Sequence, residues 1–199
     1  MTHRAPPSRI RGFNMLEVLV SLVIVVFGLL GLIGLQARAQ VAEFESYQRG
    51  QAMILVQDMA DRIQTNRKAA LCYEVTTNAA SGTPYAGTGV SSAPTCIATT
   101  GTASTRAIAT ADLSAWHDAL LGASETLGGS SVGAVLGARG CITYTSATNS
   151  YRVAVAWQGM APTVAPTAGD TAATCGKDLY GTETQRREVS TTVRIAVLS

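Results

Sequence analysis

An apolar run near the amino terminus constrains this chain more than any other feature. Residues 13–35 are apolar almost without interruption and contain one full charge, Glu17. Because about 20 residues at a rise of about 1.5 Å each span the hydrocarbon core of a bilayer, the run is long enough to cross a membrane as a helix. A carboxylate in such a segment costs about 2 to 3 kcal/mol on insertion scales. We therefore expect Glu17 to have a partner and a function.

The residues before the run indicate its orientation and its processing. Residues 1–12 contain three arginines and no acid, which predicts that this end stays on the cytoplasmic side and that the rest of the chain faces outward. A secretory signal has a shorter apolar core followed by a small-residue cleavage site. Here the small residue, Gly12, precedes the run. Cleavage between Gly12 and Phe13 would remove the leader, keep the helix and leave a new amine close to Glu17.

The order of Gly12, Phe13 and Glu17 resembles the class III signal of type IV pilins and type II secretion pseudopilins. The resemblance implies that a prepilin peptidase cleaves after Gly12 and methylates Phe13, and that Glu17 meets the amino terminus of a neighbouring subunit during assembly. An ammonium and a carboxylate that are buried together each lower the desolvation cost of the other. Asn14 and Met15 depart from the commoner Thr-Leu or Thr-Ile, but the spacing of the signal is intact.

The segment after Leu35 changes from uniformly apolar to amphipathic. Its apolar side chains at helical spacing are Ala52, Leu55, Val56, Met59 and Ile63. Since no proline occurs between Phe13 and about Asn66, one helix of roughly 80 Å is possible. The glycines at 28, 31 and 34 permit either close helix packing or local melting, and the sequence leaves both open.

A second resemblance lies in this amphipathic segment. The sequence Asp-Met-Ala-Asp-Arg at 58–62, followed by Asn66 and Arg67, resembles the minor pilins of the PilV type, also called type IV pilus modification proteins. Asp58 and Arg62 also have the i, i+4 spacing of an exposed helical ion pair, which contributes a few tenths of a kcal/mol. We interpret these charges mainly as keeping the helix soluble.

The rest of the chain is expected to form a globular domain on the amphipathic helix. Residues 70–111 read as a long irregular connection with one short strand at 72–75. Asp112 is the predicted N-cap of a short helix that buries Leu113, Trp116, Leu120 and Leu121. Strands are predicted at 140–145, 151–157 and 188–197, the first two as an antiparallel hairpin. A long helix across an antiparallel sheet is an α+β fold, and the pilin resemblance implies the same arrangement.

The four cysteines lie in the part that is predicted to be outside the cytoplasm, where disulfides are the default. We favour the sequential pairs, Cys72 with Cys96 and Cys141 with Cys175, while two other connectivities remain open. Each bond would contribute about 2 to 4 kcal/mol to stability. A metal site is not expected, because only His117 remains after the leader is removed and no compact ligand cluster is visible.

Composition and motifs argue against an enzyme and against strong binding of nucleic acid. The formal net charge is +2, and removal of residues 1–12 leaves 12 basic side chains against 13 acidic ones, whereas nucleic-acid binders usually have a basic face. The G-x-S-x-G pattern at 129–133 has no strand signal before it and no histidine after it, as a nucleophile elbow would require. We expect no catalytic residues and no cofactor.

The predicted organisation is a cleaved leader at 1–12, a transmembrane half-helix at 13–35, an amphipathic half-helix at 36–69 and a periplasmic or extracellular domain at 70–199. The resemblance implies a single-pass inner-membrane minor pilin that helps to initiate type IV pilus assembly, enters the pilus on the cell surface and serves twitching motility. Its partners would be the prepilin peptidase, the major and other minor pilins, the assembly machinery and the lipid bilayer. The alternatives are a minor pseudopilin of type II secretion and a tip adhesin or DNA-binding minor pilin that uses the loop at 159–187.

Overall fold

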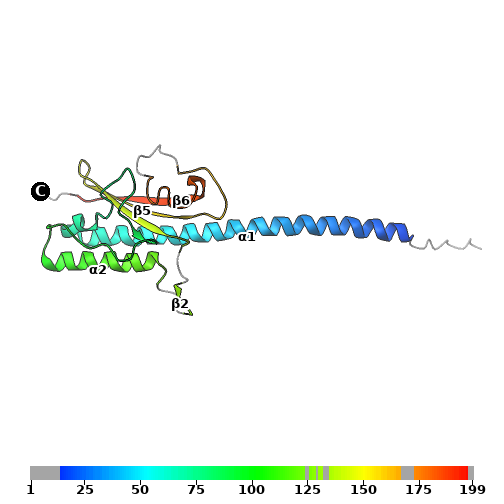
Figure 1. The fold of residues 1–199 in the computed structure, drawn as a ribbon, viewed down its shortest axis with the longest axis horizontal. Coiled ribbons are helices and arrows are strands. Elements are labelled where there is room, and N and C mark those ends of the chain that lie inside the picture. The colour runs from blue at the N-terminus through cyan, green and yellow to red at the C-terminus, as the bar shows by residue number, and fades with distance from the viewer. Residues whose placement is uncertain (1–13, 124–125, 129, 132–134, 167–172, 197–199) are drawn as a thin grey trace, which may run out of the picture. The chain divides into compact units, whose positions relative to one another are not determined.

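A 51-residue helix, α1, runs from Met15 to Thr65 in the computed structural model (Figure 1). The structure describes residues 14–123, 126–128, 130–131, 135–166 and 173–196. The chain divides into two compact units, the first at 1–42 and the globular unit at 43–199, and α1 contributes residues to both. The uninterrupted helix agrees with the absence of proline over this range. The helix also continues through Gly28, Gly31 and Gly34.

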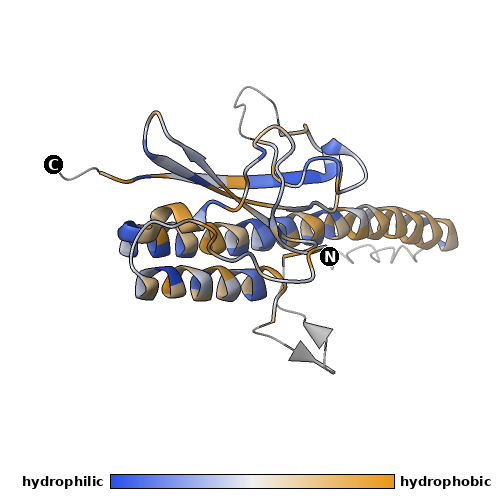
Figure 2. Cartoon of the chain, turned by 60° about the vertical axis from the view of Figure 1, so that its left-hand side comes forward, coloured by the Kyte–Doolittle hydropathy of each residue, from blue (hydrophilic) through white to orange (hydrophobic). Residues whose placement is uncertain are grey.

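In the first unit, the described part of α1 is exposed along its whole length. Its apolar side chains are exposed on every side of the helix, and Figure 2 colours this part of the helix as mostly hydrophobic. By length and composition this helix can cross a membrane. A helix that is apolar all round requires either a bilayer or a packed core around it, so the first unit fits membrane anchoring.

In the globular unit, α1 buries one face against the rest of the domain. The buried residues are Gln48, Ala52, Val56, Met59, Ala60 and Ile63. The predicted apolar face is therefore correct, with Leu55 only partly buried at its edge. The predicted amphipathic half at 36–69 is longer than the part that packs. Burial begins at Gln48, α1 ends at Thr65, and a 3₁₀ segment, η1 (Arg67–Tyr73), follows it.

Helix α2, Ala103–Leu120, begins ten residues earlier than expected. Thr102 is the N-cap, and it forms a capping box with Thr105: the Thr102 hydroxyl accepts from the Thr105 amide at 3.2 Å, and the Thr105 hydroxyl accepts from the Thr102 amide at 2.9 Å. The prediction of Asp112 as N-cap was wrong, because Asp112 lies inside the helix. The same helix shows that the predicted irregular connection ends before residue 103.

The main sheet has four strands in the order β1-β4-β5-β6, with every neighbouring pair antiparallel. Their bounds are Ala86–Gly87, Arg139–Thr145, Ser150–Gln158 and Arg186–Arg194. A separate antiparallel pair consists of β2, Thr126–Leu127, and β3, Ser130–Ser131. A short 3₁₀ segment, η2 (Glu183–Gln185), leads into β6. The predicted hairpin is confirmed, and the last strand occupies 186–194 rather than 188–197.

The strand predicted at 72–75 is absent from the described structure. Cys72 lies in η1, and the amides of Val75 and Thr76 instead donate to the carbonyl oxygen of Ile142 on β4. The segment is extended but makes too few ladder hydrogen bonds to form a strand. The strand that completes this edge of the sheet is β1, which the sequence did not predict.

The two faces of the sheet are buried by different parts of the chain, because strand side chains alternate in direction. One face packs on α1 and α2, which lie side by side below the sheet (Figures 1 and 2). It contributes Ile142, Val153, Val155, Trp157 and Val193 to the main core. The other face contributes Cys141, Ala154 and Ala156 to a smaller cluster with Cys175 and Tyr180. The predicted α+β fold, a long helix on a small antiparallel sheet, is confirmed.

One glycine is required where the sheet meets α2. A Cβ atom on Gly140 would lie 2.3 Å from a ring carbon of Trp116, so only glycine leaves room for the indole. The indole Nε1 of Trp116 in turn donates to the backbone oxygen of Leu55 on α1 at 2.9 Å. Trp116 thus joins both helices to the sheet.

Candidate assembly helix and polar networks

Glu17 lies in the first turn of α1, on an exposed apolar helix. The backbone oxygen of Asn14 accepts from the amide of Glu17 at 2.9 Å and starts the helix. A carboxylate in the first turn is favourable because the helix amino terminus carries partial positive charge. Among the described residues, no side chain is placed to neutralise this carboxylate. The partner of Glu17 stays a prediction.

The other residues of the predicted processing site lie outside the described residues. Gly12 and Phe13 belong to the segment 1–13, so cleavage, methylation and the pairing of Phe13 with Glu17 stay predictions.

A polar network joins the end of α1 to α2. The guanidinium of Arg62 donates to Asp58 at 2.9 Å, which is the predicted i, i+4 pair, and to Asp112 at 2.8 Å. The hydroxyl of Tyr73 donates to the other oxygen of Asp112 at 2.5 Å, and Asn66 donates to Tyr73 at 3.1 Å. Burial and the hydrogen bond to Asp112 raise the pKa of Tyr73 above its ordinary value. Arg62 therefore does more than keep the helix soluble, since it bridges two helices.

The cysteines form two disulfides, Cys72 with Cys96 and Cys141 with Cys175, which are the pairs favoured from the sequence. The second disulfide fastens the chain around Cys175 to β4, on the sheet face away from the helices. Tyr180 packs in the cluster around this second disulfide, and its hydroxyl lies 2.9 Å from the carbonyl oxygens of Gly137 and Ala156. Burial raises the pKa of Tyr180 to about 12.

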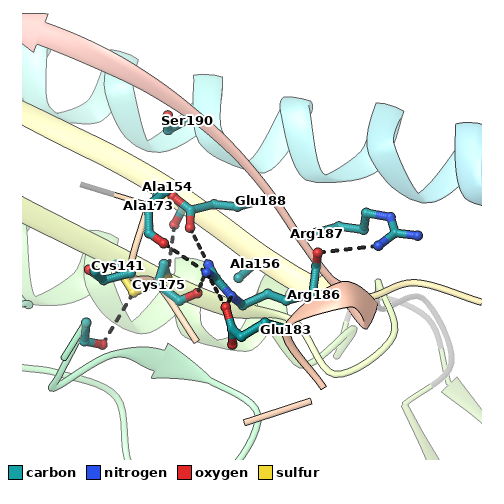
Figure 3. A network of polar contacts seen from close by, with 12 residues as sticks. Cys141, Ala154, Ala156, Ala173, Cys175, Glu183, Arg186, Arg187, Glu188 and Ser190 are labelled. Atoms are coloured by element: carbon teal, nitrogen blue, oxygen red, sulfur yellow. Dashed lines mark hydrogen bonds and ion pairs between the residues drawn. A yellow bond between two sulfur atoms is a disulfide. The ribbon is translucent and has the colours of Figure 1, made fainter. Parts of the chain in front are cut away.

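The guanidinium of Arg186 is the centre of this cluster and is almost fully buried (Figure 3). It donates to both acids that flank it on the chain, to Glu183 at 2.6 Å and to Glu188 at 2.8 Å. It also donates to the carbonyl oxygens of Ala173 and Cys175, at 2.9 and 3.1 Å. One buried arginine thus joins β6 to the segment that carries the disulfide.

Two acids bond to Arg186. Burial is the largest influence on the pKa of Glu183 and would raise it, but the hydrogen bonds from Arg186 and from the Asp178 amide, together with the charges of Arg186 and Lys177, hold that pKa below its ordinary value. Glu188 is bound on both oxygens, by Arg186 and by Arg152 at 3.0 Å. We interpret the network as stabilising the fold, because the charges of its arginines and glutamates are compensated within the domain.

A second contact ties the loop after β5 to α1. The carboxylate of Glu45 accepts from the amides of Met160 and Ala161 at 2.9 and 3.1 Å, and from Arg187 at 3.3 Å. A Cβ on Gly159 would lie 2.6 Å from the Arg187 guanidinium, so glycine leaves the space that this arginine occupies. The sequence analysis missed Glu45 and Arg187. The run of three charged residues at 186–188 was a usable signal, since neighbouring strand residues face opposite sides and such a run places charges on both faces of the sheet.

His117, the histidine considered as a metal ligand, has a packing role. It is buried in α2, and its Nδ1 accepts from the amide of Gly87 on β1 at 3.0 Å. This hydrogen bond requires that Nδ1 carries no proton, so the ring is neutral with the proton on Nε2. The bond fixes the short strand β1 against α2.

The fold and the apolar helix fit one class of protein, in which a helix able to cross a membrane leads into a small disulfide-bonded α+β domain. A family model, Tt1218-like, described as type IV pilin Tt1218, matches residues 34–114. These residues include the part of α1 that packs in the globular unit, η1, β1 and the first two thirds of α2, and they are less than half of the chain. No curated protein and no solved structure matches the chain. The family match and the fold together support a type IV pilin, a structural protein.

Proposed function

We propose that the chain is a minor pilin of the PilV type, which helps to initiate type IV pilus assembly and then enters the pilus. The observation that carries the proposal is Glu17, a single carboxylate in the first turn of α1, within the apolar and exposed segment of that helix that ends at Leu35. The match of residues 34–114 to a type IV pilin family supports it independently. The PilV-like segment at 58–67 favours a pilus subunit over a subunit of the secretion apparatus.

The proposed mechanism begins in the inner membrane, with the amino terminus in the cytoplasm and the globular unit in the periplasm. A prepilin peptidase cleaves after Gly12 and methylates Phe13. The new amine and the carboxylate of Glu17 on a neighbouring subunit then pair and set the axial register, because two opposite charges in an apolar environment are far less costly together than apart. The apolar half of α1 packs among the helices of the major and other minor pilins.

The first experiment deletes the gene in its native cell, counts surface pili by electron microscopy and assays exported enzymes in the same cultures. Loss of pili with normal export supports the proposal. Loss of export with normal pili would assign the chain to type II secretion as a minor pseudopilin. If both remain normal, a tip adhesin or DNA-binding role replaces the proposed one.

A second experiment tests the role of Glu17. The Glu17→Ala variant should be cleaved normally but should be lost from sheared pili. Ser21→Ala is the matched control, because Ser21 lies one turn further along the same exposed helix and its hydroxyl bonds only to the backbone of Val18. Normal incorporation of Glu17→Ala would contradict the proposed mechanism.

A further inference from the structure

A pocket of about 340 Å³ lies between α1 and the ends of β5 and β6 in the globular unit. Its size falls in the usual range of ligand pockets, which begins at about 300 Å³. The lining residues are Glu45, Ser46, Arg49, Trp157, Arg187 and Glu188. The pocket shares Glu188 with the network around Arg186, and it does not include the amino-terminal segment that carries Glu17.

The acids of this pocket are already bound. Glu45 accepts from Arg187 and from two backbone amides, and Glu188 accepts from Arg186 and Arg152. Arg187 is used as well, since it also donates to the carbonyl oxygens of the loops around it. These groups form the wall of the pocket and carry no excess charge.

The remaining polar groups of the pocket can all donate a hydrogen bond, and only the hydroxyl of Ser46 can also accept one. Arg49 is exposed and makes no hydrogen bond or ion pair with any described residue, and the hydroxyl of Ser46 makes none either. The indole Nε1 of Trp157 is buried and has no acceptor in the part of the chain that the structure describes. A buried donor without an acceptor costs about 1 to 3 kcal/mol. The pocket therefore presents one uncompensated positive charge and an excess of donors, which is suited to a carboxylate.

Two half-exposed methionines neighbour residues that line the pocket. Met53 lies four residues after Arg49 on α1, hence on the same side of the helix, and Met160 is held beside the pocket by the bond from its amide to Glu45. Methionine adapts to irregular apolar partners, and an arginine beside apolar side chains is typical of protein interfaces. This combination favours an acidic side chain of a protein over a small free anion.

We propose that this pocket receives an aspartate or glutamate side chain from a neighbouring subunit of the pilus, with Arg49 as its main partner. This inference rests on the proposed function and adds a contact between globular units to the contact at Glu17. The carboxylate binds the guanidinium of Arg49 and the hydroxyl of Ser46, while the methionines cover the apolar part of the incoming side chain. The bidentate geometry of a guanidinium makes the contact specific for a carboxylate.

The test uses the full chain in cells that lack the chromosomal copy and measures the amount of each variant in sheared pili relative to the membrane. Arg49→Glu should reduce incorporation about tenfold or more, because it places like charges together. Arg49→Lys should retain part of the incorporation, since it keeps the charge but loses the bidentate contact. Arg67→Glu is the control: it makes the same charge change at an exposed residue beyond the end of α1.

A photo-crosslinking amino acid at Met53 identifies the partner directly. A cross-link to a peptide of a pilin subunit that contains Asp or Glu supports the inference, and a cross-link to any other protein or within the chain contradicts it. Normal incorporation of Arg49→Glu, with the wild-type chain present in pili, would overturn the inference and leave the proposed function intact. Absence of the wild-type chain from pili would instead overturn the proposed function.

Discussion

Replacement of Arg186 by methionine tests how much the buried arginine contributes to the stability of the globular unit. Methionine is similar in length and apolar, so Arg186→Met removes the guanidinium but leaves most of the packing volume. The change leaves the side chain of Glu188, which is only 3% exposed, with Arg152 as its hydrogen-bonded partner. It also leaves the carbonyl oxygen of Cys175 without the donor that it has in the native domain.

The magnitude follows from these losses. Removing one partner of a buried ion pair costs about 3 to 5 kcal/mol, because the other charge stays buried. Since Arg152 still compensates Glu188, and Glu183 is partly exposed to water, we expect the lower end, about 3 kcal/mol. This is a large share of the 5 to 15 kcal/mol that typically stabilises a domain.

The assay is equilibrium urea unfolding of the full chain in mild detergent, followed by the fluorescence of Trp116 and Trp157. The urea concentration at the midpoint of unfolding should fall, while the slope of the free energy of unfolding against urea concentration stays unchanged. Arg194→Met, at an exposed position of the same strand, should change stability by less than about 0.5 kcal/mol. Adding Glu188→Gln to Arg186→Met should cost less than the sum of the two single changes. A loss below about 1 kcal/mol for Arg186→Met would refute the reasoning.

Three further predictions concern the same domain. The folded pKa of Glu183 lies below the unfolded value of 4.5, so its contribution to stability is present above that value and is lost as the pH falls through the folded pKa. Glu183→Gln should therefore reduce the fall in the free energy of unfolding at acidic pH, measured by urea unfolding at a series of pH values. An unchanged dependence on pH would contradict this. Thr102→Ala should cost about 1 kcal/mol by removing the cap of α2, whereas Thr99→Ala, outside the helix, should cost little in the same assay. Gly140→Ala should destabilise by about 1 to 3 kcal/mol through its clash with Trp116; a thermal midpoint equal to that of wild type would contradict this.

Local patterns in the sequence predicted the helices and strands whose apolar residues recur at a regular spacing. The alternation in β5 and the apolar spacing of α1 both survive in the structure, because each buried face needs the same residues that the pattern displays. The disulfide pairs that form were favoured from the order of the cysteines along the chain, which left two other connectivities open. The capping box at Thr102 was visible in principle, but the alanine- and threonine-rich stretch after it has little apolar periodicity, and Asp112 was a stronger isolated signal.

The remaining features depend on contacts between distant parts of the chain. Nothing local indicates that Arg62 meets Asp112, or that Glu45 on α1 holds the loop after β5. The short strand β1 forms because Gly87 is fixed by His117 and paired with Arg139, so its cause lies outside its own two residues. The function predicted for Phe13 and Glu17 would arise from contacts between subunits, and a single chain contains no such contacts.

The order of the sheet places β6 at an edge, where it pairs with β5 among the described strands. Such an edge has free backbone donors and acceptors that can pair with another copy and start aggregation. Arg194 is an exposed charge on this edge, and charged side chains on an edge strand oppose such pairing. The strand that holds the disulfide-bonded segment therefore also discourages edge-to-edge association when many copies of the domain are crowded together.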